Sequence, residues 1–240
     1  MNRKVLIGAV VVVLLLAGVG VGAYAINVFT PRTTSSSSDS SAPLSTPSSS
    51  PSVGGTLAGK WAVTSGSSAG YRANEKFLEQ SSPSQAVADS TGVSGGVTIV
   101  DNGGALTAQQ LSVVVDMSKL KSSDQFAIHG SNQRDRFVNP NYLETGQFPT
   151  ATYAVDSISI PATAAAGGQQ QLSTSGKLTI HGVTKDVSIP MTGQVNGDKL
   201  EVQGSVAINM TDYGVRPPSV PFTSVQPGVT IAFHVFFARA

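Results

Sequence analysis

One short segment in the second half of the chain contains two runs in which apolar and polar residues alternate. Leu178 and Ile180 alternate with polar neighbours in the first run, and Val187 and Ile189 do so in the second. Because successive side chains of a β-strand point to opposite faces, each run forms one apolar face of an extended strand. Gly182 lies between the runs and can adopt the positive φ angle of a tight turn. The segment therefore predicts a β-hairpin whose two apolar faces point to one interior.

The same alternation recurs at residues 111–117, 200–208 and 229–237, and turn-forming residues such as Asn102 and Gly103 separate the alternating segments. Closely spaced strands with such turns indicate an antiparallel all-β domain. The pattern alone fits either a closed barrel or a sandwich of two sheets. It also fits either an interior filled by its own side chains or a hollow one.

The N-terminal part of the chain is predicted to lie outside this domain. Residues 5–26 contain no charged side chain, and Arg3 and Lys4 precede them. A helix of about 20 apolar residues spans a bilayer core of about 30 Å, and the preceding basic residues favour an N-terminus on the inside. We predict residues 1–29 to be a membrane anchor, with a cleaved secretory signal ending at Ala25 as the alternative. Either interpretation places the remaining chain outside the cytoplasm.

Residues 30–56 are dominated by serine, threonine and proline. So few apolar residues cannot offset the entropy lost on ordering, and we predict a disordered linker. A flexible chain of about 26 residues has a reach of roughly 28 Å. The remaining residues, 57–240, are long enough to form a single domain with one core.

Composition and motifs exclude several kinds of site. The formal net charge of +1, with 12% charged residues, provides no basic stripe for nucleic acid. The chain has no cysteine, and His129, His181 and His234 have no partners at metal-ligand spacing, so no metal or cofactor is expected. Residues 66–70 match Gly-x-Ser-x-Gly around Ser68, but that motif is catalytic only in an alternating strand-helix fold. We therefore expect no enzymatic activity.

Three motifs point to a known family. The chain carries Leu-Thr-Ile-His-Gly-Val-Thr-Lys from Leu178, Asn-Gln-Arg-Asp from Asn132 with Phe-Pro-Thr from Phe148, and Asn-Met-Thr-Asp-Tyr-Gly from Asn209. In this combination they resemble the YceI-like family of polyisoprenoid-binding proteins. The resemblance implies an antiparallel, lipocalin-like β-barrel of about eight strands with a short helical insertion. It also implies a long apolar ligand inside the barrel.

On this resemblance, we expect a membrane-tethered, extracytoplasmic protein that sequesters or carries a long-chain isoprenoid or a similar lipid. The expected apolar lining is Val113, Val115, Leu178, Ile180, Val187, Ile189, Val206, Ile208, Ile231 and Phe233. The expected loop cover is Arg134, Asp135, Phe137 and Tyr142. Arg134 and Asp135 are interpreted as a structural pin for this loop, with contact to the ligand head group as the alternative. The alternative function is a non-enzymatic module that presents its loops to a protein or an envelope partner, and the oligomeric state is left open.

Overall fold

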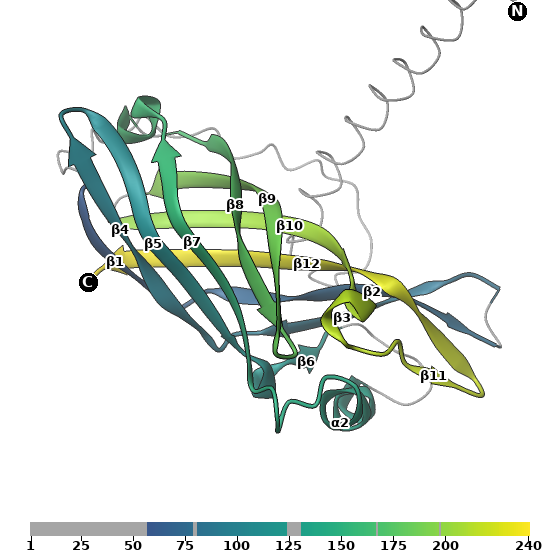
Figure 1. Ribbon diagram of the computed structural model, residues 1–240. Coiled ribbons are helices and arrows are strands. Elements are labelled where there is room, and N and C mark those ends of the chain that lie inside the picture. The colour runs from purple at the N-terminus through teal and green to yellow at the C-terminus, as the bar shows by residue number, and fades with distance from the viewer. Residues whose placement is uncertain (1–56, 79–80, 124–130, 167, 197) are drawn as a thin grey trace, which may run out of the picture. The chain divides into compact units, whose positions relative to one another are not determined.

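The computed structural model describes residues 57–78, 81–123, 131–166, 168–196 and 198–240 (Figure 1). The predicted anchor, residues 1–29, and the predicted linker, residues 30–56, lie outside the described residues. Within the described ranges, no helix is both long enough and apolar enough to cross a membrane.

Twelve strands are assigned in the described part of the chain, and four short helical segments connect them. The strands are β1 (Gly59–Val63), β2 (Ser68–Phe77), β3 (Ser84–Ser90), β4 (Val93–Asn102), β5 (Ala105–Asp116), β6 (Lys121–Ser122), β7 (Thr150–Ile160), β8 (Gln170–Ile180), β9 (Val183–Asn196), β10 (Lys199–Asn209), β11 (Ser219–Val220) and β12 (Thr223–Arg239). The helical segments are η1 (Met117–Lys119), α2 (Ser131–Asn141), η2 (Ala162–Ala166) and η3 (Met210–Tyr213).

Eight of the described strands form a closed antiparallel barrel. Their order is β1-β4-β5-β7-β8-β9-β10-β12, and β12 pairs back to β1, with Trp61 opposite Arg239 and Val63 opposite Phe237. The expected barrel with a short helical insertion is thereby confirmed, and the sandwich alternative is wrong because the strands close into a ring. Of the remaining four strands, β2, β3 and β6 continue from β12 in that order, and β11 pairs with β12 (Figure 1).

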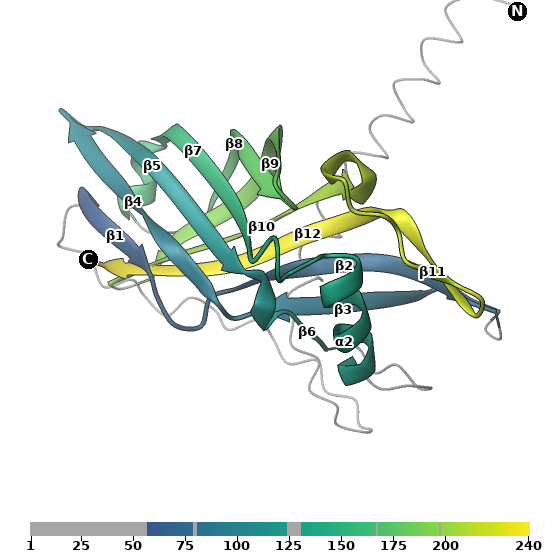
Figure 2. The ribbon, with the colours of Figure 1, turned by 60° about the horizontal axis from the view of Figure 1, so that its bottom comes forward.

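The two ends of the barrel differ. At one end Trp61, only 3% exposed, belongs to an apolar cluster with Leu106, Val235 and Phe237. The guanidinium of Arg239 lies 4.5 Å from the centre of the Trp61 ring. We call this the closed end. The opposite end, which we call the mouth, carries α2, η3 and the β11-β12 turn (Figure 2).

The hairpin predicted from the sequence is present as β8 and β9, with Ile180 opposite Val183. Both turn residues adopt positive φ, His181 at 51° and Gly182 at 74°. The sequence predicts this conformation for the glycine but not for the histidine. Contacts with the segment between α2 and β7 hold His181 in place, because its ring centre lies 4.1 Å from that of Phe148 and its Nε2 lies 3.1 Å from Glu144 Oε2.

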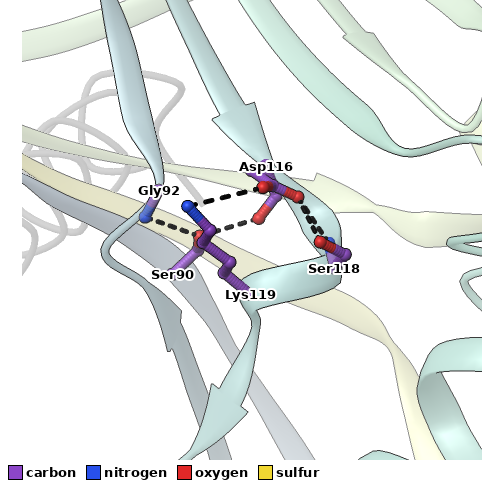
Figure 3. A network of polar contacts seen from close by, with 5 residues as sticks. All are labelled: Ser90, Gly92, Asp116, Ser118 and Lys119. Carbon is purple, nitrogen blue, oxygen red and sulfur yellow. Dashed lines mark hydrogen bonds and ion pairs between the residues drawn. The ribbon is translucent and has the colours of Figure 1, made fainter.

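A polar network fixes the corner at which β5 ends (Figure 3). The buried Ser90 hydroxyl donates a 2.7 Å hydrogen bond to the Asp116 carbonyl and accepts one of 3.1 Å from the Gly92 N–H. The Asp116 carboxylate caps η1 by accepting bonds from the Ser118 hydroxyl and N–H at 2.6 and 3.0 Å. The hydroxyl bond holds the pKa of the Asp116 carboxyl below its usual value. The network therefore ties the end of β3 to the end of β5 at the mouth.

Substitutions of two turn glycines test whether packing against Phe148 constrains the turn between β8 and β9. Gly103 and Gly182 have φ angles of 69° and 74°. A Cβ at Gly103 would have no neighbour within 4 Å, whereas one at Gly182 would lie 2.9 Å from Cε1 of Phe148. We expect Gly103→Ala to lower the free energy of unfolding by about 1–2 kcal/mol through backbone strain. Gly182→Ala should lower it further, and equal losses in denaturant titrations of the full chain would contradict this account.

Candidate functional site

The barrel encloses a cavity of about 770 Å³, which lies within the range of roughly 300–1,000 Å³ found for small-molecule sites. Alternate residues of the barrel strands and of β2 form its wall, and aliphatic and aromatic side chains dominate this wall. The interior of the described barrel is therefore hollow, which decides between the two interiors that the sequence pattern allows.

Eight of the ten residues predicted to line the interior do line the cavity. They are Val113, Val115, Leu178, Ile180, Ile189, Ile208, Ile231 and Phe233. Alternation along the strands was sufficient to find them, because a barrel strand turns every second side chain inward.

The other two predicted residues, Val187 and Val206, are not part of the cavity wall. Both pack against an apolar cluster that contains Tyr153 and Tyr213. The register between β9 and β10 ends with Gly204 opposite Met191, so the halves of these strands nearest the mouth do not pair with each other. Ile189 and Ile208, in the same halves of these strands, do line the cavity, so the missing pairing alone does not account for Val187 and Val206.

Tyr213 is a site residue that the sequence interpretation missed. It lines the cavity, its side chain is 2% exposed, and its buried hydroxyl has no hydrogen-bond partner among the described residues. Burial raises the pKa of the Tyr213 phenol, and the nearby Asp212 carboxylate adds to this effect. The available signal was the motif that begins at Asn209, whose asparagine caps η3 and whose Gly214 ends it at φ 75°.

A second tyrosine in the same wall has its hydroxyl satisfied. Tyr153 Oη lies 3.1 Å from the carbonyl oxygen and 3.0 Å from the hydroxyl of Thr174. Burial raises the pKa of the Tyr153 phenol as well, and the Thr174 hydrogen bond opposes this effect. Tyr153 therefore provides an internal comparison for Tyr213.

An ion pair also forms part of the cavity wall. Arg134 of α2 donates a 2.6 Å hydrogen bond to Glu75 Oε1 of β2, and the two side chains are 11% and 4% exposed. Both residues line the cavity. Two buried opposite charges compensate each other, whereas one left alone would carry a large desolvation cost. The pair therefore joins α2 to the barrel and adds no net charge to the wall.

The helix α2 forms the loop cover that the resemblance implies. Phe137 and Tyr142 line the cavity, and their rings meet edge to face with centres 5.5 Å apart. Asp135 does not line it; its carboxylate accepts hydrogen bonds from the Ser122 hydroxyl at 2.6 Å and the Ser122 N–H at 3.1 Å. Asp135 is thus a structural pin to β6, while Arg134 combines a pin to β2 with a place in the cavity wall.

The other candidates from the sequence lie away from the cavity or outside the described residues. His129 lies outside them. His234 Nε2 is 2.6 Å from Glu201 Oε1, and Ser68 at the start of β2 is registered opposite His234. The residues next to this pair, Ala69 and Phe233, line the cavity, so Ser68 and His234 belong to the outer face. The described part of the chain contains no group of three side chains suited to hold a metal ion.

The model of the YceI-like domain matches residues 64–237. The chain belongs to the YceI-like family. A UPF0312 protein from Pseudomonas syringae pv. tomato is 26% identical over 119 residues, which are 47% of this chain and 58% of that protein. The chain thus spans less than two thirds of that relative.

Among solved structures, a polyisoprenoid binding domain from Saccharophagus degradans, implicated in plant cell wall breakdown, has the same fold as this YceI-like protein. The match has a TM-score of 0.53 at 16% identity and covers 75% of this chain and 98% of that one.

A double-mutant cycle tests the ion pair of this YceI-like barrel. We expect Glu75→Gln and Arg134→Met to show a coupling energy of about 1–3 kcal/mol, because each single change leaves a buried charge without its partner. The exposed pair Lys177–Asp186, joined at 3.0 Å with side chains 65% and 84% exposed, is the matched control and should couple by less than about 1 kcal/mol. Chemical unfolding measures both cycles, and similar coupling energies would contradict the argument.

Replacing each tyrosine by phenylalanine tests the unpartnered hydroxyl. Tyr153→Phe removes a satisfied hydrogen bond and should lower the free energy of unfolding by about 1 kcal/mol. Tyr213→Phe removes a buried hydroxyl without a partner, so stability should stay the same or rise. Because folding raises both phenol pKa values, the parent protein should lose stability as the pH rises above about 10, and each variant should lose less. Equal losses in both variants at neutral pH would show that Tyr213 is hydrogen-bonded.

Proposed function

We propose that this YceI-like protein binds a long-chain isoprenoid or a similar lipid with the tail inside the barrel. The cavity of about 770 Å³ with its apolar wall carries this proposal. Each buried methylene contributes about 0.8 kcal/mol, so a long tail has a large gross tendency to leave water. The ordering of the tail and of the protein offsets part of this gain.

The distribution of polar groups in the wall fits an amphiphile with one orientation. The wall near the closed end is formed by side chains such as Ile99, Ile160 and Phe237, whereas Glu75 and Arg134 lie near the mouth. A tail directed to the closed end would therefore leave the polar end of the lipid close to the polar part of the wall. In the opposite orientation, the hydrophobic tail would lie against charged side chains and the polar head would be buried among apolar ones.

The protein would sequester or carry its lipid without making or breaking bonds. The alternative, a module that presents loops to a partner, requires no interior cavity, whereas the described barrel is hollow. We also propose that the domain works outside the cytoplasm, tethered through residues 1–29 and the linker 30–56. The uncharged residues 5–26, preceded by Arg3 and Lys4, support this location.

Lipid extraction tests the binding proposal. The full chain is purified in a mild detergent and extracted with organic solvent, and the extract is analysed by mass spectrometry. We expect a lipid with a long apolar tail in an amount comparable to that of the protein. An extract that contains only lipids present in equal amount in a mock purification would contradict the proposal.

Two neighbouring positions on β5 provide a matched pair of variants. Val113 lines the cavity, whereas Val114 is absent from its wall and points to the other face of the strand. Val113→Trp should reduce the amount of recovered lipid several-fold by filling the cavity, and Val114→Trp should retain it. Val113→Phe replaces the larger substitution if unfolding measurements show that Val113→Trp is not folded. Equal lipid recovery from the folded inward and outward variants would place the lipid outside the barrel.

A further inference from the structure

The large apolar side chains that are exposed in the described residues all lie at the mouth. Leu78 is 80% exposed, Phe222 51% and Phe137 44%. Phe137 and Phe222 also line the cavity. The N–H of Leu78 donates a 3.0 Å hydrogen bond to the Phe222 carbonyl, so the end of β2 lies beside the β11-β12 turn (Figures 1 and 2). We call Leu78, Phe137 and Phe222 the mouth rim.

The position of the mouth rim makes it more than a set of scattered surface residues. Isolated exposed apolar side chains are common on proteins, but a group of them around one opening marks an interaction site. Because two of the three residues reach from solvent into the cavity wall, a surface that covers the rim would also cover the entrance. The partner of the rim therefore meets the same opening through which a ligand passes.

Basic side chains accompany the mouth rim. The exposed residues Lys76 and Arg136 lie two positions before Leu78 and one position before Phe137, respectively. A third exposed basic residue, Arg216, follows Val215, which lines the cavity.

Acidic groups near the mouth are fewer or already engaged. Glu75 is paired with Arg134, and the Asp135 carboxylate accepts hydrogen bonds from Ser122. Asp212 of η3 is exposed, and Glu79 lies outside the described residues. The described surface around the entrance thus combines protruding apolar side chains with the three exposed basic residues Lys76, Arg136 and Arg216.

We propose that the mouth rim docks on the surface of a lipid bilayer that contains anionic lipids, with Leu78, Phe137 and Phe222 inserted at the boundary between head groups and acyl chains. Interfacial membrane-binding elements combine apolar side chains that insert with lysine and arginine residues that meet anionic head groups. The uncharged segment 5–26 supports this partner, because a linker with a reach of roughly 28 Å would keep the domain close to a membrane. The tether belongs to the proposed function, whereas the exposed rim and its basic residues are independent of that proposal.

Docking at the mouth would give the lipid a dry route between bilayer and barrel. A tail that crosses water exposes its methylenes at a cost of about 0.8 kcal/mol each. When the entrance rests on the bilayer, the tail can move past Phe137 and Phe222 into the cavity with little exposure to water. The rim would therefore act in loading and release of the ligand, and the closed end of the barrel would face away from the contact.

The absence of cysteine from the chain allows a site-specific test. Leu78→Cys and, as the control at the closed end, Asn102→Cys are each labelled with an environment-sensitive fluorophore in the full chain. The labelled proteins are reconstituted into phosphatidylcholine vesicles with or without phosphatidylglycerol, and quenching by a spin-labelled phosphatidylcholine is measured. With phosphatidylglycerol we expect quenching at position 78 to exceed that at position 102 several-fold, and to fall as salt is added.

Variants of the rim complete the test. Phe222→Ser combined with Phe137→Ser, in the labelled Leu78→Cys chain, should reduce the quenching to the level of position 102. Because both rings are substantially exposed, the unfolding midpoint should show that this variant remains folded. Equal quenching at positions 78 and 102 would overturn the proposal. A change in the fluorescence of the label at position 78 that already occurs without vesicles, through self-association of the protein, would overturn it as well. Quenching that does not depend on phosphatidylglycerol would overturn the role of anionic lipids.

The same preparations distinguish this proposal from the proposed lipid binding. Lipid recovered by solvent extraction, together with no preferential quenching at position 78, would overturn membrane docking and leave the binding function in place. Preferential quenching at position 78 without any recovered lipid would support the docking surface and count against a lipid carrier.

Discussion

The pairing of β12 with strands on both of its sides is the constraint on which the rest of this barrel depends. This strand of seventeen residues pairs with β10 on one side, and on the other side first with β2 and then, towards its C-terminus, with β1. Its register to β2 shifts between Val225 and Val229, where the strand is irregular. Because β1 pairs with both β12 and β4, the eight barrel strands close into a ring. A chain without cysteine thus obtains its enclosed interior from backbone hydrogen bonds and packing.

The same arrangement explains why the barrel is packed at one end and hollow towards the other. At the closed end, Trp61 and Phe237 fill the ring together with branched aliphatic side chains. Towards the mouth, β2 and β3 contribute small side chains to the wall, including Ala69, Ala73 and Ala86. Small residues on two adjacent strands leave volume that no neighbouring side chain occupies, and this volume is part of the cavity.

The mouth is held in place by contacts between distant parts of the chain. α2 is attached through Arg134 to Glu75, through Asp135 to Ser122, and through a 3.3 Å hydrogen bond from Asn139 to the Leu120 carbonyl. These attachments place the polar part of the cavity wall next to the exposed apolar rim. An amphiphilic ligand and a membrane surface each require a polar and an apolar region in close proximity, and the mouth provides both. The fold thereby links the proposed ligand site to the proposed docking surface.

The sequence by itself determined the alternating strands β5, β8, β9, β10 and β12, the direction of their apolar faces and the turn at Gly182, because the two-residue period of a β-strand is a local property. It did not predict β2 and β3. That period was enough to find eight wall residues, whereas Val187 and Val206, which follow the same alternation, are not part of the cavity wall. Nor could it find the contact between Glu75 and Arg134, which are 59 positions apart. Only the tertiary structure decided that the interior is hollow, because the same alternation serves a filled and an empty barrel. The volume of the cavity depends on which side chains face each other across the barrel. Those side chains come to face each other only after the sheet has closed.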